Sequence, residues 1–170
     1  MSVLWVDGHK ARTPKGTVSL PIDAFLHRLP AAVRAVPLMT ANNVDADTKE
    51  RIESDPYCDR IGIEVVELKP RAARVELTLE QSHCNFHGTP HGGVIYSLAD
   101  AAFAAASNAS GETAVALETN ISYLDTVDVG TTITATATEE HDTTRTGTYE
   151  VQVKGGDDVL AIFRGRVYRP

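Results

Sequence analysis

The chain has 170 residues, a net charge of −7 and 42% hydrophobic residues, which suits one soluble domain with a sizeable core. No apolar run approaches the ~18 residues of a membrane span, the first thirty residues lack a secretory signal, and so acidic a body disfavours nucleic acid as a partner. Two cysteines, Cys58 and Cys84, are too few for a disulfide framework, so we expect a reduced, cytoplasmic protein.

Residues 1–38 differ from the rest of the chain in charge and in pattern. They carry five Lys or Arg against two Asp, a net charge of +3 that leaves −10 for the remainder, and four prolines interrupt them. We therefore expect an N-terminal extension, either disordered or the result of a start codon assigned too far upstream. One domain over residues 39–170 would follow it. An ordered arm that packs on a partner subunit is the alternative.

A short helix and six strands are predicted around a long apolar stretch. Asp45 or Asp47 can cap a helix over residues 48–54, which Asp55-Pro56 would end. The predicted strands are residues 61–68, 74–80, 113–124, 131–138, 149–154 and 159–168. The last two strands are joined by a glycine-rich turn. Because strands and helices do not alternate, we expect an α+β fold in which an antiparallel sheet packs one helix against its apolar face.

The apolar stretch between the second and third strands carries the chemistry. Residues 93–107 are small or apolar except for one charged side chain, Asp100. Such a helix is buried, and a buried carboxylate is costly unless it is paired or used. Gly92 and Gly93 stand where the bare N–H groups of the helix end point outward. A helix end that stabilises an anion and one buried carboxylate are the groups needed to hydrolyse an acyl group.

These two groups are too far apart to act together within one chain. Eight residues separate Gly92 from Asp100, which is ~12 Å of helix at ~1.5 Å per residue. If both are catalytic, the helix end of one subunit must face Asp100 of another. A two-fold dimer with antiparallel helices would contain two such sites.

The motifs around this helix are Asn85, His91-Gly92-Gly93, Ser97-Leu98-Ala99-Asp100, Asn108, Asn120-Ile121-Ser122-Tyr123-Leu124, Gly130 and Phe163-Arg164-Gly165. Together they resemble those of the hotdog-fold acyl-CoA thioesterases of the phenylacetate-degradation (PaaI-like) type. The resemblance covers about residues 45–169. It implies a sheet wrapped around one long central helix, an acyl- or aryl-acyl-CoA substrate, no cofactor, and a homodimer or homotetramer with active sites at the subunit interface.

The resemblance also implies a role for each catalytic residue. Asp100 would activate water as a base or attack the thioester directly, and the Gly92 N–H of the partner subunit would polarise the carbonyl. Asn85, with His91 near it, would help to hold the carbonyl or the water. Some relatives orient the water with a serine at the position of Ala116 in this chain, so the choice between base and nucleophile stays open. No general acid is required, because a thiol with a pKa near ~8.5 leaves readily as thiolate.

The substrate-binding residues are expected at Gly93, Tyr96, Phe103 and Tyr123. The acyl group itself is not readable from the sequence. Asp100 as a purely structural carboxylate, and an acyl-CoA-binding or -sensing protein without turnover, are the alternatives. A hydratase on the same fold would need an Asp/His pair on a different loop, and we find none.

Histidines 83, 87 and 91, together with Cys84, have a spacing that would suit a metal only in a helix. Gly88 and Pro90 oppose a helix there, so we expect no metal site.

Overall fold

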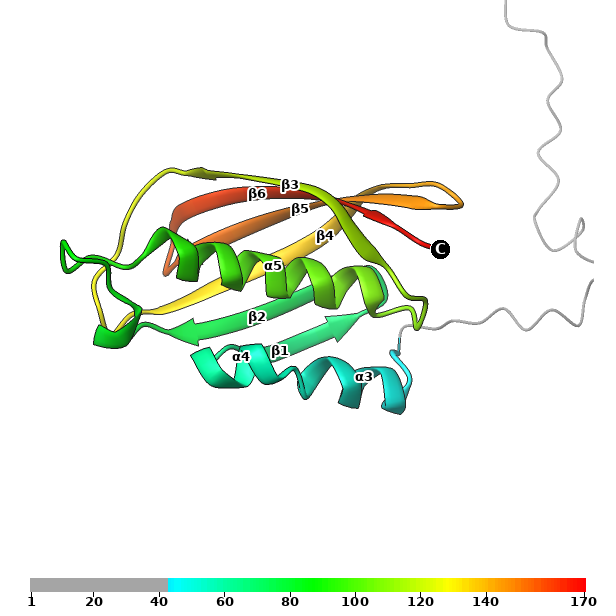
Figure 1. Cartoon of the computed structure of the whole chain (residues 1–170), viewed down its shortest axis with the longest axis horizontal. Helices are drawn as coiled ribbons and strands as arrows, with labels where there is room; N and C mark the ends of the chain where they lie inside the picture. Colours follow the sequence, from blue (N-terminus) through cyan, green and yellow to red (C-terminus); the bar gives the residue numbers. More distant parts are fainter. Residues whose placement is uncertain (1–42) are drawn as a thin grey trace, which may run out of the picture. The chain divides into compact units, whose positions relative to one another are not determined.

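The computed structural model describes residues 43–170, in which a six-stranded antiparallel sheet curves around one long helix (Figure 1). The helices are α3 (Ala46–Glu53), α4 (Pro56–Ile61) and α5 (Gly92–Asn108), with a 3₁₀ turn, η1, at Gln81–His83. The strands are β1 (Glu64–Lys69), β2 (Ala72–Thr78), β3 (Val115–Tyr123), β4 (Thr132–Asp142), β5 (Thr146–Gly155) and β6 (Asp158–Tyr168). The predicted α+β hotdog architecture is confirmed. The predicted extension, residues 1–38, lies outside the described residues.

Helix α5 packs its alanine-rich side against β2, β4 and β5. Ala99, Ala102 and Ala106 are buried there, and their small side chains let the helix approach the sheet closely. Phe103 fills the remaining space, with its ring 5.6 Å from that of Phe163. A Cβ at Gly165 would lie 2.7 Å from the Phe103 ring, so that strand position must be glycine. The core therefore fixes the rotation of α5 about its axis, and with it the direction of Asp100.

The prediction of the first strand was wrong at its start, because a second short helix was missed. Asp55 does not simply end α3. Its carboxylate accepts hydrogen bonds from the N–H groups of Tyr57, at 2.8 Å, and Cys58, at 3.0 Å, and so caps α4. Pro56 occupies the first helical position, where its missing N–H is harmless. Of the two predicted caps of α3, the structure selects Asp45, which accepts from the N–H of Thr48 at 2.9 Å.

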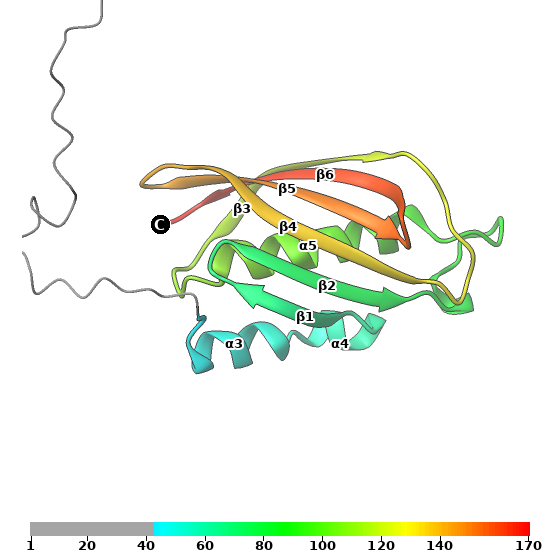
Figure 2. The same cartoon turned by 180° about the vertical axis from the view of Figure 1, so that it is seen from behind.

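The two edges of the sheet are covered differently. The strand order is β1-β2-β4-β5-β6-β3, which leaves β1 and β3 at the edges. Helices α3 and α4 run beside β1 (Figure 2). Strand β3 is open along its outer edge in the described part of the chain, and it exposes Val115 and Leu117, with Leu124 just beyond its end. An exposed apolar edge strand offers a surface for pairing with another chain.

Within residues 43–170, no helix combines the length and the hydrophobicity that crossing a membrane requires.

Candidate active site

The first turn of α5 presents one free backbone donor. The helix begins at Gly92, and His91 caps it by accepting a hydrogen bond from the Gly93 N–H to Nδ1, at 2.7 Å. Tyr123 at the end of β3 donates from Oη to the Gly92 carbonyl, at 2.9 Å. The Gly92 N–H has no acceptor among residues 43–170. It therefore remains at the positive end of the helix dipole, available to a ligand oxygen.

Gly92 and Gly93 lie close to two aromatic rings and have ordinary backbone angles. A Cβ at Gly92 would lie 3.3 Å from the Tyr123 ring, and one at Gly93 would lie 2.8 Å from Nδ1 of His91. Neither glycine has a positive φ. The two rings occupy the space that side chains at these positions would need, so the glycines let both rings contact the helix end.

Asp100 lies two helical turns farther along α5 and is half-buried. Within the described residues, its carboxylate makes no hydrogen bond and no ion pair. Burial raises its pKa above the ordinary value of 3.8. Since ~12 Å of helix separates it from Gly92, a single chain does not bring both groups to one carbonyl.

The side chain of Asn85 is engaged in its own loop. Its Oδ1 accepts from the N–H groups of His87, at 2.9 Å, and Thr89, at 3.3 Å, and its Nδ2 donates to the Thr89 hydroxyl at 2.9 Å. These bonds shape the loop that leads into α5. One amide N–H of Asn85 remains for a substrate, so its predicted role in holding a carbonyl or water stays a prediction.

The structure separates the three aromatic residues that were expected to bind substrate. Tyr96 is half-buried and shares a hydrogen bond with the Thr119 hydroxyl on β3. Tyr123 is 50% exposed beside Gly92, whereas Phe103 is only 2% exposed and belongs to the core. Burial, with the Tyr96 phenol nearby, raises the pKa of Tyr123 above 10, so its hydroxyl is a donor at neutral pH.

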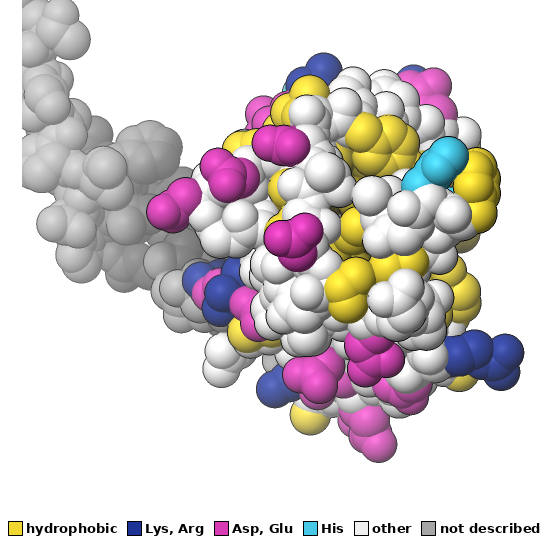
Figure 3. All heavy atoms as spheres, turned by 90° about the vertical axis from the view of Figure 1, so that its left-hand side faces the viewer, with side chains coloured by type: hydrophobic (Ala, Val, Ile, Leu, Met, Phe, Trp, Pro, Cys, Tyr) yellow, Lys and Arg dark blue, Asp and Glu magenta, His cyan; other side chains and the backbone are white. Residues whose placement is uncertain are grey.

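A cavity of about 270 Å³ opens beside the first turn of α5. His91 and Gly93 line it, together with Tyr57 of α4 and Ser97 of α5. The Tyr57 and Ser97 hydroxyls are 2.8 Å apart, and Ser97 donates to the Gly93 carbonyl at 2.9 Å. Two of the predicted site residues therefore border a cavity. Figure 3 shows the end of the molecule that carries the loop leading into α5. Hydrophobic side chains lie at the surface there, among acidic ones.

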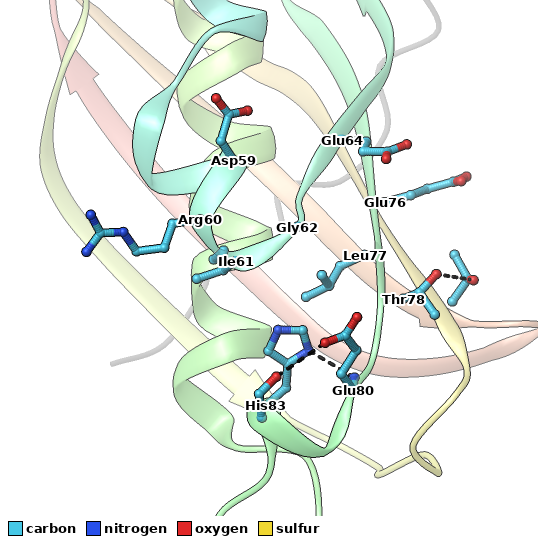
Figure 4. Close-up of a pocket in the computed structure, with 12 residues that line it drawn as sticks. Asp59, Arg60, Ile61, Gly62, Glu64, Glu76, Leu77, Thr78, Glu80 and His83 are labelled. Atoms are coloured by element: carbon cyan, nitrogen blue, oxygen red, sulfur yellow. Dashed lines mark hydrogen bonds between the residues drawn. The ribbon is translucent and has the colours of Figure 1, made fainter.

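A second cavity, of about 440 Å³, contains none of the predicted site residues (Figure 4). Four of its lining residues are acidic and one is basic: Asp59, Glu64, Glu76, Glu80 and Arg60. The backbone N–H of Glu80 donates to Nδ1 of His83 at 3.0 Å, which leaves the Glu80 carboxylate charged in the cavity wall. Such walls repel an anionic ligand. No three His, Cys, Asp or Glu side chains of the described chain are grouped as a metal site would need.

Comparison with known proteins identifies the family. The model of the thioesterase superfamily matches residues 87–162. The acyl-coenzyme A thioesterase PaaI of Escherichia coli is 36% identical over 118 residues, which cover 69% of this chain and 84% of that protein. The chain belongs to the thioesterase superfamily.

Two solved structures of similar proteins support this membership. The structure of the E. coli PaaI protein from the phenylacetic acid degradation operon has a TM-score of 0.70 and 32% identity, and the match covers 75% of this chain and 96% of that one. The TT0310 protein of Thermus thermophilus has a TM-score of 0.66 and 40% identity, with 68% and 98% covered. The predicted resemblance to the hotdog thioesterases is confirmed, and this thioesterase is a hydrolase by class.

Sequence reasoning missed the contacts that hold the helix end. His91 is not a usual capping residue, and its position just before two glycines was the only signal for it. The Tyr123 hydrogen bond joins residues 31 positions apart, and no local sequence pattern predicts it.

Proposed function

We propose that this thioesterase hydrolyses acyl- or aryl-acyl-CoA thioesters to the carboxylic acid and free CoA. The observation that carries the proposal is the half-buried Asp100 carboxylate, which has no partner within residues 43–170, on the same helix as the free Gly92 N–H. Partial burial destabilises the charged form of this carboxylate and so raises its pKa. The E. coli relative, an acyl-coenzyme A thioesterase by name, supports CoA as the leaving group.

The proposed reaction needs only these two groups and water. The Gly92 N–H of one subunit donates to the thioester oxygen, and Asp100 of the other subunit accepts a proton from water as the hydroxide attacks the carbonyl carbon. The tetrahedral oxyanion is held by the Gly92 N–H until the C–S bond breaks and the thiolate leaves. Burial raises the pKa of Asp100 and makes it a stronger base. Direct attack by Asp100, through an anhydride that water then cleaves, is the alternative course.

We further propose a homodimer or homotetramer with the active sites at the subunit interface. The ~12 Å between Gly92 and Asp100 requires two chains at each site. The open edge of β3 and its exposed apolar residues Val115 and Leu117 support a contact between copies of the chain.

The remaining predicted residues have supporting roles in this proposal. Tyr96 and Tyr123 lie on the β3 side of α5 and would flank the thioester, and Gly93, which lines the cavity beside the helix end, would border it. Phe103 would contact only the buried end of an acyl group, from the core. Asn85 would contribute its free amide N–H. Both cysteines are free thiols, which supports a cytoplasmic location.

The test is release of free thiol from a panel of acyl-CoAs with aliphatic chains of increasing length and with phenylacetyl and benzoyl groups. We expect release from at least one of them, and the best substrate will define the acyl class. The enzyme is kept at catalytic concentration, because Cys58 and Cys84 also react with thiol reagents. No release from any substrate by a folded dimer that still binds acyl-CoA would identify a binding or sensing protein instead.

A further inference from the structure

We infer that Tyr123 is a positioning residue, which together with His91 clamps the Gly92–Gly93 peptide and so orients the free Gly92 N–H. The inference rests on the proposed function, in which that N–H polarises the thioester carbonyl. It gives both side chains a task other than contact with the substrate.

The clamp holds one peptide group from both ends. Its carbonyl oxygen accepts from Tyr123 Oη at 2.9 Å, and its N–H donates to His91 Nδ1 at 2.7 Å. Two successive glycines resist backbone rotation less than any other pair of residues, and the first turn of a helix lacks half of its hydrogen bonds. Without the clamp this turn would lose two of the hydrogen bonds that restrain it. The clamped peptide and the peptide that carries the Gly92 N–H share the Gly92 Cα, so fixing one restricts the other.

Tyr123 is itself held firmly enough to act as an anchor. It is the last residue of β3 and pairs with Ala161 of β6. Its ring lies against Gly92, at 3.3 Å from the place where a Cβ would be. The clamp therefore transfers the rigidity of the sheet to the helix end. Donors that stabilise an oxyanion must be oriented before the charge develops, and a displacement of about 1 Å can lower the rate about a hundredfold.

The same geometry limits what His91 can do. Because Nδ1 accepts from the Gly93 N–H, only Nε2 is left to face a ligand. An asparagine at position 91 could replace the capping acceptor but not the imidazole. Comparing His91→Ala with His91→Asn therefore separates capping from substrate contact.

The test is a double-mutant cycle of Tyr123→Phe and His91→Ala, with His91→Asn as the rescue. We expect each single variant to lower kcat about tenfold with little change in KM, and His91→Asn to restore kcat to within about twofold. Because both side chains hold one peptide, the double variant should lose far less than the hundredfold of independent effects. Tyr168→Phe is the matched control. It also removes a tyrosine hydroxyl that makes one hydrogen bond, with Arg145, and Tyr168 pairs with the first residue of β3 rather than the last.

Three outcomes would overturn the clamp while leaving the proposed function intact. They are an unchanged kcat in Tyr123→Phe, a double variant with multiplied losses, and a His91→Asn variant as slow as His91→Ala. If the wild type releases no thiol from any acyl-CoA, the proposed function fails and amide hydrogen exchange decides the clamp separately. Both single variants should then speed exchange of the Gly93 N–H relative to wild type and Tyr168→Phe. Unchanged exchange would refute the clamp.

Discussion

The two parts of the proposed site lie on one helix but are held in opposite ways. At the start of α5, the Gly92–Gly93 peptide is bonded at both its carbonyl and its N–H, to Tyr123 and His91. Two turns later, Asp100 has no bonding partner among the described residues. The hydrogen bonds that hold the helix end therefore come from one chain, whereas the carboxylate is free to bind a second chain, water or substrate. The difference supports the proposal that positioning is built into the fold while the charge of Asp100 is left free to react.

Removing the charge of Asp100 should have the largest effect. An amide cannot take a proton from water, so Asp100→Asn should lower kcat by about 10²–10⁴-fold and leave the fold intact. Thiol release from the best acyl-CoA measures the loss. Asp59→Asn, an exposed position on α4, is the matched control and should keep full activity. Full activity of Asp100→Asn would show that the unpartnered carboxylate is not the base or the nucleophile.

Removing the free N–H is possible without breaking the helix. Proline is tolerated at the first helical position, and His91 already has the extended backbone, with φ −70° and ψ 134°, that a residue before proline prefers. Gly92→Pro should lower kcat by about 10²–10³-fold through loss of the oxyanion donor.

Gly92→Ala is its matched control, because it adds a Cβ against Tyr123 but keeps the N–H. We expect it to lose about tenfold at most, from displacement of that ring. Equal losses in the two variants, measured by the same thiol assay, would mean that crowding rather than the missing donor lowers the rate.

Mixing subunits tests whether the two parts meet across an interface. A dimer of one Asp100→Asn chain and one Gly92→Pro chain would contain one intact site and one doubly defective site. With random pairing, half of the dimers are mixed, so the mixture should recover about a quarter of wild-type activity. Unfolding and refolding the two variants together, and then assaying thiol release, measures this. No recovery, with mixed dimers demonstrated by differently tagged chains, would place both groups of each site in one chain.

The fold was predictable wherever one pattern dominated the local sequence. The alternation of Val75 and Leu77 with polar residues, and the apolar run on either side of Asp100, predicted strand and helix directly. Helix α4 was not predictable in the same way. Asp55-Pro56 is equally typical of a helix end and of a helix start, and only the bonds from Asp55 to Tyr57 and Cys58 show which one applies.

The chemical groups of the candidate site were predictable, but their supports were not. A lone carboxylate in an apolar helix is visible in a sequence, and so is a pair of glycines before it. The partner of the Gly92 carbonyl is not visible, because Tyr123 reaches it only after β3 has paired with β6. The burial of Phe103 is likewise not visible in the sequence, because its ring lies beside Phe163 only once α5 has packed on the sheet. The Tyr123 hydrogen bond and the burial of Phe103 both depend on tertiary packing, which the periodicity of the sequence does not encode.

The smallest expected effect is on stability, and its sign distinguishes a free carboxylate from a paired one. Burial raises the pKa of Asp100 above 3.8 in the folded chain. Between 3.8 and the raised value, the folded state therefore binds more protons than the unfolded state, and the free energy of unfolding falls as the pH rises through that window. Above the window wild type carries the full penalty of a buried charge, which Asp100→Asn lacks.

Urea unfolding at a fixed protein concentration should thus find Asp100→Asn no less stable than wild type at pH 7, with the difference shrinking as the pH is lowered toward 3.8. A structural carboxylate, hydrogen-bonded across a subunit interface, predicts the reverse, because its pKa would be lowered and its removal would leave a buried donor without a partner. A variant that is clearly destabilised at pH 7 would therefore assign Asp100 to the interface, and any loss of its activity would then reflect the assembly rather than the chemistry.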